Sequence, residues 1–251
     1  MKTLNHSHLN HELLYSKYCS LINEIEGSFR NNQFQSIPIG DEIRTALIAN
    51  LLGTSVSESM YLLNYLHKSM VLEGDICEFG IAQGLTSALL AYEIRNTDKN
   101  LWLFDSFEGL PKPSAQDQLK DDIFNLETIE AYEGTMLCPL SMIQERLKEI
   151  QFPKERTKIV SGFIEQTITN NKLPQKICFA YVDFDFYEPI LTALKYIDKK
   201  LQSGGTIIVD DYDFFSTGSK TAVDEFLTVY QNYKIYFPIK SAGKFCILEK
   251  I

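Results

Sequence analysis

Carboxylate side chains follow four apolar, strand-like stretches of the sequence, each at the point where the stretch ends. These residues are Glu78, Asp105, the pair Asp183 and Asp185, and the pair Asp210 and Asp211. In an open parallel sheet, the carboxyl ends of the strands line the ligand crevice. We therefore expect folding to gather these acids into one pocket.

The spacing within each acidic pair determines how its side chains point. Asp183 and Asp185 are two residues apart, so they project to the same face while the strand persists. Asp210 and Asp211 are adjacent and converge only if the chain turns between them. Massed carboxylates repel one another unless a cation neutralises them, and all-oxygen ligation with open positions suits Mg²⁺. For Asp105 alone, holding a turn or capping a helix is an equal alternative.

The first acid also opens a glycine-containing turn, Glu78-Phe-Gly-Ile-Ala-Gln-Gly84, where a strand leads directly into a helix. Gly80 and Gly84 let the backbone approach a ligand closely, and the start of the helix aims N–H groups at it. The spacing lacks the paired glycines of G-x-G-x-x-G, so it favours a nucleoside without phosphates over a dinucleotide. The alternative is a tight turn that binds nothing.

After residue 70, short β-rich stretches alternate with helical segments, as in βαβ units around a largely parallel sheet. The predicted strands cover 74–79, 101–105, 158–161, 177–183, 206–210, 234–239 and 245–249. The predicted helices cover 85–95, 141–150, 163–170, 189–201 and 219–231, with Gly204 and Gly205 ending the fourth. The last two strands have no helix between them, so we expect an antiparallel hairpin at the sheet edge.

Two further segments complete the predicted organisation. Residues 1–70 have helical spacing of apolar residues and form an N-terminal helical extension to a domain at 71–251. Its helices must cover their apolar stripe, either by pairing two copies of the chain in a homodimer or by covering their own active site. Residues 106–138 have no clear period, and long segments of this kind are usually lids or binding segments, so we expect a lid.

Composition limits the class of partner. The chain has 251 residues, 45% of them hydrophobic, which is enough for one large core, and a net charge of −9. Without a dense Lys/Arg run it lacks the positive patch that nucleic acid or an anionic membrane requires, so we expect a small-molecule partner. The five cysteines lack Cys-x-x-Cys spacing, which favours reduced thiols. The sequence also shows no signal-peptide or transmembrane stretch, so we expect a cytoplasmic protein.

Four blocks of the sequence resemble, in the right order, the signatures of the macrocin O-methyltransferase family. The blocks are Glu78-Phe-Gly-Ile-Ala-Gln-Gly84, Phe104-Asp-Ser-Phe-Glu-Gly-Leu-Pro111, Val182-Asp-Phe-Asp-Phe-Tyr-Glu188 and Gly204-Gly-Thr-Ile-Ile-Val-Asp-Asp-Tyr212. The resemblance covers about residues 70–232. Members of this family transfer a methyl group from S-adenosylmethionine to sugar hydroxyls of macrolides and related natural products.

The resemblance implies an α/β class I methyltransferase (Rossmann-like) fold, with S-adenosylmethionine and Mg²⁺ as cofactors. The cofactor-binding residues that it implies are Glu78, Gly80, Gly84, Asp105, Ser106, Ser161, Gly162 and Gln166. The glycine turn would lie under the methionine part, Asp105 would bind the ribose hydroxyls, and 161–166 would lie near the adenine. The implied Mg²⁺ ligands are Asp183, Asp210 and Asp211.

The reaction expected from this resemblance is methylation of a hydroxyl on a small, glycosylated or polyhydroxylated acceptor. A hydroxyl held on Mg²⁺ becomes acidic enough to attack the sulfonium methyl near neutral pH. Asp183 is the expected base and Asp185 the second candidate, because Phe186 stands where related catechol-type methyltransferases have a lysine. Six aromatic residues are candidates for stacking on the acceptor: Phe107, Phe124, Tyr132, Tyr212, Phe214 and Phe215. We expect about two of these six to touch it.

Two other classes of function stay open on sequence alone. One is a catalytically silent binding or scaffold protein that keeps the methyltransferase fold. The intact acids argue against such a loss of catalytic activity. The other is a nucleotide-dependent oxidoreductase, which the absence of G-x-G-x-x-G disfavours. The C-terminal hairpin and the N-terminal 70 residues depart from the family pattern, so the sequence leaves the acceptor unspecified.

Overall fold

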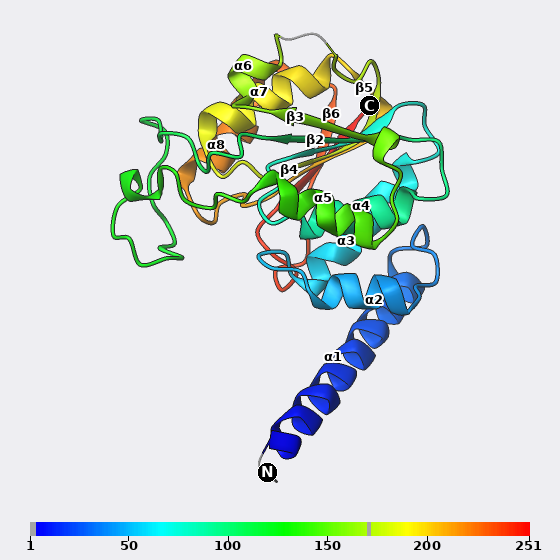
Figure 1. Cartoon of the computed structure of the whole chain (residues 1–251). Helices are drawn as coiled ribbons and strands as arrows, with labels where there is room; N and C mark the ends of the chain where they lie inside the picture. The colour runs from blue at the N-terminus through cyan, green and yellow to red at the C-terminus, as the bar shows by residue number, and fades with distance from the viewer. Residues whose placement is uncertain (1–3, 170–171) are drawn as a thin grey trace.

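Seven strands form one sheet in the order β3-β2-β1-β4-β5-β7-β6 in the computed structural model, which describes residues 4–169 and 172–251 (Figure 1). The strands are β1 Asp75–Phe79, β2 Leu101–Asp105, β3 Thr157–Ser161, β4 Ile177–Val182, β5 Leu201–Val209, β6 Tyr233–Tyr236 and β7 Cys246–Lys250. The first five pair in parallel, and β7 runs antiparallel to both β5 and β6. Every strand that the sequence predicts is present, and the antiparallel pair is confirmed at the C-terminal end.

Helices cover both faces of this sheet (Figure 1). They are α1 Leu4–Asn32, α2 Glu42–Ala49, α3 Val56–Ser69, α4 Leu85–Ile94, α5 Leu140–Glu149, α6 Ile164–Thr167, α7 Tyr187–Asp198 and α8 Thr217–Val229. Apolar side chains of α3, α4 and α5 form one buried cluster with the sheet, and those of α6, α7 and α8 form another on the opposite face. The helices alternate with strands because each parallel connection must cross over the sheet.

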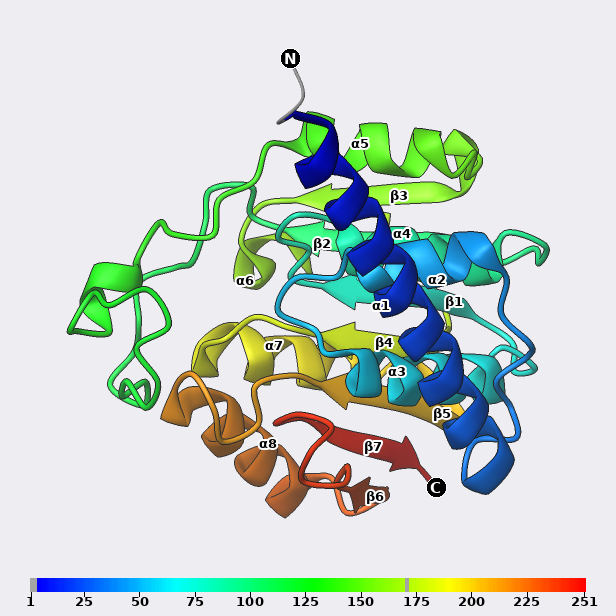
Figure 2. The ribbon, with the colours of Figure 1, turned by 90° about the horizontal axis from the view of Figure 1, so that it is seen from below.

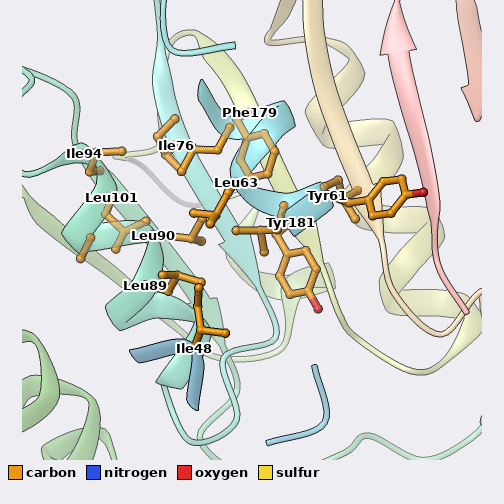
Figure 3. Packing of buried hydrophobic residues seen from close by; sticks show 14 of the residues in the cluster. Ile48, Tyr61, Leu63, Ile76, Leu89, Leu90, Ile94, Leu101, Phe179 and Tyr181 are labelled. Atoms are coloured by element: carbon orange, nitrogen blue, oxygen red, sulfur yellow. The ribbon is translucent and has the colours of Figure 1, made fainter. Parts of the chain in front are cut away.

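The central strand β4 is apolar throughout because both of its faces are covered. Phe179 and Tyr181 point into the cluster with α3 and α4, whereas Ala180 and Val182 belong to the cluster with α7 and α8. Figure 3 shows Phe179 and Tyr181 among apolar side chains that include Leu63 of α3. Burial on both faces fixes the register of β4, and with it the position of the acids that follow the strand.

The N-terminal helices are joined to the rest of the chain through α3. Leu62, Leu63 and Leu66 of this helix are fully buried in the same cluster as Ile76 of β1 and Ile208 of β5. The predicted boundary at residue 70 therefore falls between two elements, α3 and β1, that share one core.

A buried ion pair fixes α2 against α4. Arg44 donates from Nε and Nη2 to the two carboxylate oxygens of Glu93, at 2.7 and 2.6 Å, and His67 Nε2 lies 2.6 Å from the same group. Burial opposes ionisation, but the hydrogen bonds from His67 and Arg44 outweigh it and lower the pKa of Glu93 below its usual value. Through Arg44, Glu93 and His67 this group joins α2, α4 and α3, and residues 52–54 lie in the connection between α2 and α3.

The N-terminal half of α1 projects from the body of the molecule (Figure 1), and α1 lies against α2 and α3 (Figure 2). Ile22 is buried, whereas five large apolar residues before it are 42–63% exposed: Leu13, Leu14, Tyr15, Tyr18 and Leu21. Among the described residues, no helix has the combination of length and apolar character that crossing a bilayer requires.

The prediction that Gly204 and Gly205 end a helix is wrong. Gly204 and Gly205 lie inside β5 and do not end the preceding helix, because α7 already stops at Asp198. Ile177 of β4 pairs with Leu201, but the next paired residue, Phe179, faces Thr206, so β5 carries extra residues in a bulge. Gly204 has a φ of +79°, the left-handed conformation that such an irregularity favours in glycine.

Candidate functional site

A cavity of about 600 Å³ opens at the carboxyl ends of β1, β2, β4 and β5. Seven acidic residues line it: Glu78, Asp105, Glu165, Asp183, Asp185, Asp210 and Asp211. Within the described part of the chain, its lining contains no Lys, Arg or His. The sequence-based expectation that the strand-end acids share one pocket is met.

Three of these acids form a compact group. Asp183, Asp185 and Asp211 each offer a carboxylate oxygen within 4.8 Å of the other two. The strands end before the acids, at Val182 and Val209, and both Asp185 and Asp211 have positive φ values, +62° and +54°. Turns therefore bring these carboxylates together. The sequence predicts a turn for Asp210 and Asp211, whereas Asp183 and Asp185 lie beyond the end of their strand and not within it.

Asp210 lies on the cavity wall beside this group, and both of its oxygens accept hydrogen bonds. Oδ1 accepts from the backbone N–H of Asp211 at 2.8 Å, and Oδ2 accepts from the hydroxyl of Tyr181 at 2.7 Å. Each carboxylate oxygen keeps a second lone pair for another partner. The three acids grouped by distance thus include Asp185, whereas the resemblance implies Asp210 as a ligand.

Among the described residues that line the cavity, none provides a positive charge that would compensate the acidic group. Burial, and then the charge of Asp210, raises the pKa of Asp183 well above its usual value, and burial with Asp183 raises the pKa of Asp185 to about 8. Burial likewise raises the pKa of Asp210 and, together with Asp210, the pKa of Asp211. Acids held together against this cost, with oxygen donors only, are a chemically suitable donor set for a hard divalent cation.

The glycine turn after β1 brings the backbone of two strands together. A Cβ on Gly80 would lie 1.8 Å from the carbonyl oxygen of Asp183, and Gly80 has a φ of +82°. A Cβ on Gly84 would lie 2.7 Å from Cδ1 of Ile143, so this glycine allows α4 and α5 to approach. Gly80 lines the cavity and Gly84 does not.

Asp105 accepts a hydrogen bond from the glycine turn after β1 and also lines the cavity. Its Oδ2 accepts from the backbone N–H of Ile81 at 2.8 Å, and its Oδ1 accepts from that of Phe107 at 2.7 Å. Ser106, next to it, donates from Oγ to the carbonyl of Gly109 at 2.9 Å, and it also lines the cavity. These bonds fix the carboxylate at the end of β2.

The segment expected near the adenine meets the cavity through its middle residues. Gly162, Phe163, Ile164 and Glu165 line the cavity, whereas Ser161 and Gln166 at its two ends do not. The N–H of Gly162 donates to the carbonyl of Asp105 at 2.9 Å, which joins this turn to the end of β2.

Glu78 is a buried acid at the base of the cavity. Its Oε2 accepts from the hydroxyl of Ser87 on α4 at 2.5 Å. Burial is the largest effect on this group and raises its pKa to about 8, with Asp105 acting in the same direction against the bond from Ser87. The raised pKa favours the protonated form of this carboxyl group in the folded protein.

Other lining residues come from positions outside the four sequence blocks that resemble the family signatures. Residues 52–54, between α2 and α3, reach the cavity, and no local sequence signal marks them. The segment at 106–138 contributes Ile123, Phe124 and Leu137 to the lining and packs around its own buried Tyr132. Phe124 and Phe214 are the two of the six candidate aromatic residues that line the cavity.

Comparison with curated proteins finds relatives that are named as O-methyltransferases. The chain is 25% identical over 142 residues to 8-demethyl-8-(2,3-dimethoxy-alpha-L-rhamnosyl)-tetracenomycin-C 4'-O-methyltransferase of Streptomyces olivaceus, covering 55% of this chain and 53% of that protein. It is 26% identical over 146 residues to mycinamicin III 3''-O-methyltransferase of Micromonospora griseorubida, covering 55% of each chain. The chain thus matches about half the length of these relatives.

Solved structures share the fold over most of the chain. The O-methyltransferase NovP superposes with a TM-score of 0.68 at 17% identity, covering 94% of this chain and 98% of that one. The calicheamicin methyltransferase CalS11 superposes with a TM-score of 0.63 at 19% identity, covering 92% and 91%. The predicted class I methyltransferase fold is confirmed by these similarities. Residues 63–248 match the family model described as macrocin-O-methyltransferase (TylF), and the chain belongs to that family.

Proposed function

We propose that this protein transfers the methyl group of S-adenosylmethionine to a hydroxyl of a small glycosylated acceptor, in a reaction that requires Mg²⁺. The observation that carries the proposal is the group of three acids, Asp185 buried and Asp183 and Asp211 partly buried, beside the glycine turn after β1, in a lining without a basic residue among the described residues. Family membership supports the reaction class.

The charge of the cavity supports S-adenosylmethionine as the donor. Its sulfonium and ammonium groups are cations, which an acidic lining attracts, whereas a dinucleotide pyrophosphate would be repelled. In the proposed site, the backbone at Gly80 lies along the methionine part, and Asp105 accepts from the ribose hydroxyls. Phe163 and Ile164 supply apolar surface for the adenine. The tomaymycin-pathway O-methyltransferase TomG was solved with this cofactor and shares the fold, with a TM-score of 0.53 at 14% identity.

Asp183 and Asp211 are the proposed principal ligands of the cation, because they belong both to the group defined by distance and to the ligand set that the family resemblance implies. Asp210, implied by the resemblance, and Asp185, indicated by distance, are the two candidates for the third ligand. When bound, the cation stabilises the negative charge that develops on the acceptor oxygen and helps to orient that oxygen.

A carboxylate is the proposed base, since the lining offers no His or Lys within the described residues. Asp183 is our first candidate and Asp185 the second, and the lysine position of catechol-type enzymes holds Phe186, whose side chain is buried in a separate apolar cluster. Transfer to the acceptor is an in-line displacement, so the remaining task of the site is to hold oxygen, methyl carbon and sulfur in line.

The rim of the cavity supports a neutral acceptor with an apolar body. Leu52, Ile123, Phe124 and Leu137 line the cavity and are 41–65% exposed. A sugar nucleotide carries a diphosphate, for which this lining provides no basic side chain. In our proposal the sugar lies near the acids, the apolar aglycone lies on the rim, and the segment at 106–138 is the lid over both.

The assembly and location that we propose are a homodimer in the cytoplasm. The exposed apolar residues on the N-terminal half of α1 support pairing through that helix, and five unpaired thiols suit a reducing compartment. Sedimentation velocity of the full chain tests the dimer.

Turnover assays test the proposed function. Purified protein is incubated with S-adenosylmethionine and a library of hydroxylated glycosides, with Mg²⁺ or with EDTA, and S-adenosylhomocysteine is measured. We expect product only with Mg²⁺, and calorimetric cofactor binding that EDTA leaves largely unchanged. Cofactor binding without turnover on any acceptor would favour the silent scaffold instead. Full turnover in EDTA would contradict the role of the metal.

A further inference from the structure

Tyr181 links the core of the sheet to the acidic site. Its ring is buried in the apolar cluster under α3 and α4 (Figure 3), and its hydroxyl donates to Oδ2 of Asp210 at 2.7 Å. Because Oδ1 of Asp210 accepts from the Asp211 N–H at 2.8 Å, both oxygens of this carboxylate are held by fixed donors. The orientation of Asp210 is therefore set from behind, by a residue that does not line the cavity.

Glu58, on the N-terminal helix α3, lies close to Tyr181 and Asp210. This carboxyl group is buried, with 4% of the residue exposed, and its Oε1 lies 3.4 Å from the hydroxyl of Tyr181. The hydroxyl of Tyr181 therefore lies between the carboxyl groups of Glu58 and Asp210. Glu58 lies outside residues 63–248, the part of the chain that matches the family model.

Contacts at the start of α3 hold Glu58 in place. The hydroxyl of Ser55 accepts from the backbone N–H of Glu58 at 3.0 Å and donates to the carbonyl of Ala242 at 2.6 Å. A Cβ on Gly243, next to Ala242, would lie 3.2 Å from Oε2 of Glu58, so the loop between β6 and β7 closes over the carboxyl group. An N-terminal helix and the C-terminal hairpin thus meet behind Asp210.

We propose that Tyr181 and Glu58 are positioning residues that fix the Asp210 carboxylate, and with it the turn carrying Asp211, for binding of the divalent cation. This inference rests on the cation of the proposed function. Partners that orient a metal's surroundings in this way commonly change metal affinity by about 10- to 100-fold when they are removed.

The first test removes the hydroxyl of Tyr181 and leaves its ring. We measure the affinity of the cofactor-free protein for Mn²⁺ by calorimetry and expect Tyr181→Phe to bind about 10-fold more weakly than the wild type. The matched control is Tyr196→Phe on α7, which removes a buried hydroxyl that has no hydrogen-bond partner among the described residues. Its Mn²⁺ affinity should equal that of the wild type.

The second test separates positioning by Glu58 from simple packing. Glu58→Gln keeps the size of the side chain and an oxygen beside the Tyr181 hydroxyl, so its Mn²⁺ affinity should stay near that of the wild type, whereas Glu58→Ala should weaken binding about as much as Tyr181→Phe. Ser55→Ala, which removes the cap of α3 and a contact that holds Glu58, should lower Tm and weaken Mn²⁺ binding by less than Glu58→Ala does.

Two results would overturn the inference, and they are distinguishable. If the wild type binds Mn²⁺ and Tyr181→Phe and Glu58→Ala bind it equally well, the positioning role is wrong while the proposed function stands. If the folded wild type binds no Mn²⁺, the cation of the proposed function fails and this inference fails with it.

Discussion

The carbonyl oxygen of Asp183 lies 1.8 Å from the point that a Cβ on Gly80 would occupy. The turn after β1 and the end of β4 are therefore in direct backbone contact, and any side chain at Gly80 would push them apart. Because the first contact is with backbone, which has little freedom to move, the site is sensitive to the smallest substitution here.

Gly80→Ala should accordingly lose affinity for S-adenosylhomocysteine by more than about 10-fold and lower Tm, since strain at such a position costs about 1–3 kcal/mol before the clash is counted. Calorimetry and thermal unfolding measure the two effects. Gly27→Ala in α1 is the control, because a Cβ there has no heavy atom within 4 Å. Unchanged cofactor affinity in Gly80→Ala would refute the placement of the cofactor against this turn.

The third metal ligand can be assigned by comparing Asp185→Asn with Asp210→Asn. Asp185 belongs to the group whose carboxylate oxygens lie within 4.8 Å, whereas Asp210 is already held by Tyr181 and the Asp211 N–H. Because neutralising a ligand removes both charge and a donor, the variant at the true ligand position should lose Mn²⁺ affinity by at least about 10-fold more than the other. Asp183→Asn and Asp211→Asn should each abolish Mn²⁺ binding, and retention of binding in either would exclude it as a principal ligand.

The pH dependence of stability should report the buried Glu78. Its pKa in the folded protein, about 8, lies above the ordinary value of 4.5, so the folded state retains a proton that the unfolded state has released. The stability that this proton contributes is complete below pH of about 4.5 and is lost as pH rises through 8, with a slope of up to about 1.4 kcal/mol per pH unit.

Urea unfolding of the metal-free protein between pH 5.5 and 8.5 measures this slope. Asp185, whose pKa is also raised to about 8, acts in the same direction. Glu78→Gln should therefore flatten the pH dependence without removing it, because the amide cannot ionise. The same slope in the wild type and in Glu78→Gln would show that Glu78 is ionised in the folded protein.

Phe124 should contribute to acceptor binding and not to cofactor binding. It lines the cavity from the segment at 106–138 and is half exposed, so it is available for stacking. Phe124→Ala should raise KM for the acceptor about 5- to 10-fold while leaving affinity for S-adenosylhomocysteine unchanged. Phe237→Ala, an exposed aromatic residue outside the cavity lining, is the matched control. An unchanged KM would place the acceptor elsewhere.

Sequence alone determined where the strands lie along the chain and which acids follow them. Residues such as Asp105 and Asp183 stand directly after runs of apolar residues, and that alternation is a local property of the chain. The glycine turn after β1 is local as well, because positive φ at Gly80 requires only the absence of a side chain. The wrong prediction for Gly204 shows the limit of local patterns. The bulge at this glycine depends on the pairing of β5 with β4 and not on the neighbours of the glycine in sequence.

Tertiary structure decided which polar groups meet. Tyr181 lies 29 residues from Asp210 and 123 residues from Glu58, and no periodicity or motif connects them. Residues 52–54 enter the cavity, while Ser161 and Gln166 stay outside its lining, because helix packing and turn direction set those positions. Local patterns fix which face a side chain occupies along its own element, but the distance between two elements depends on how their buried surfaces pack, and only the folded chain holds that information.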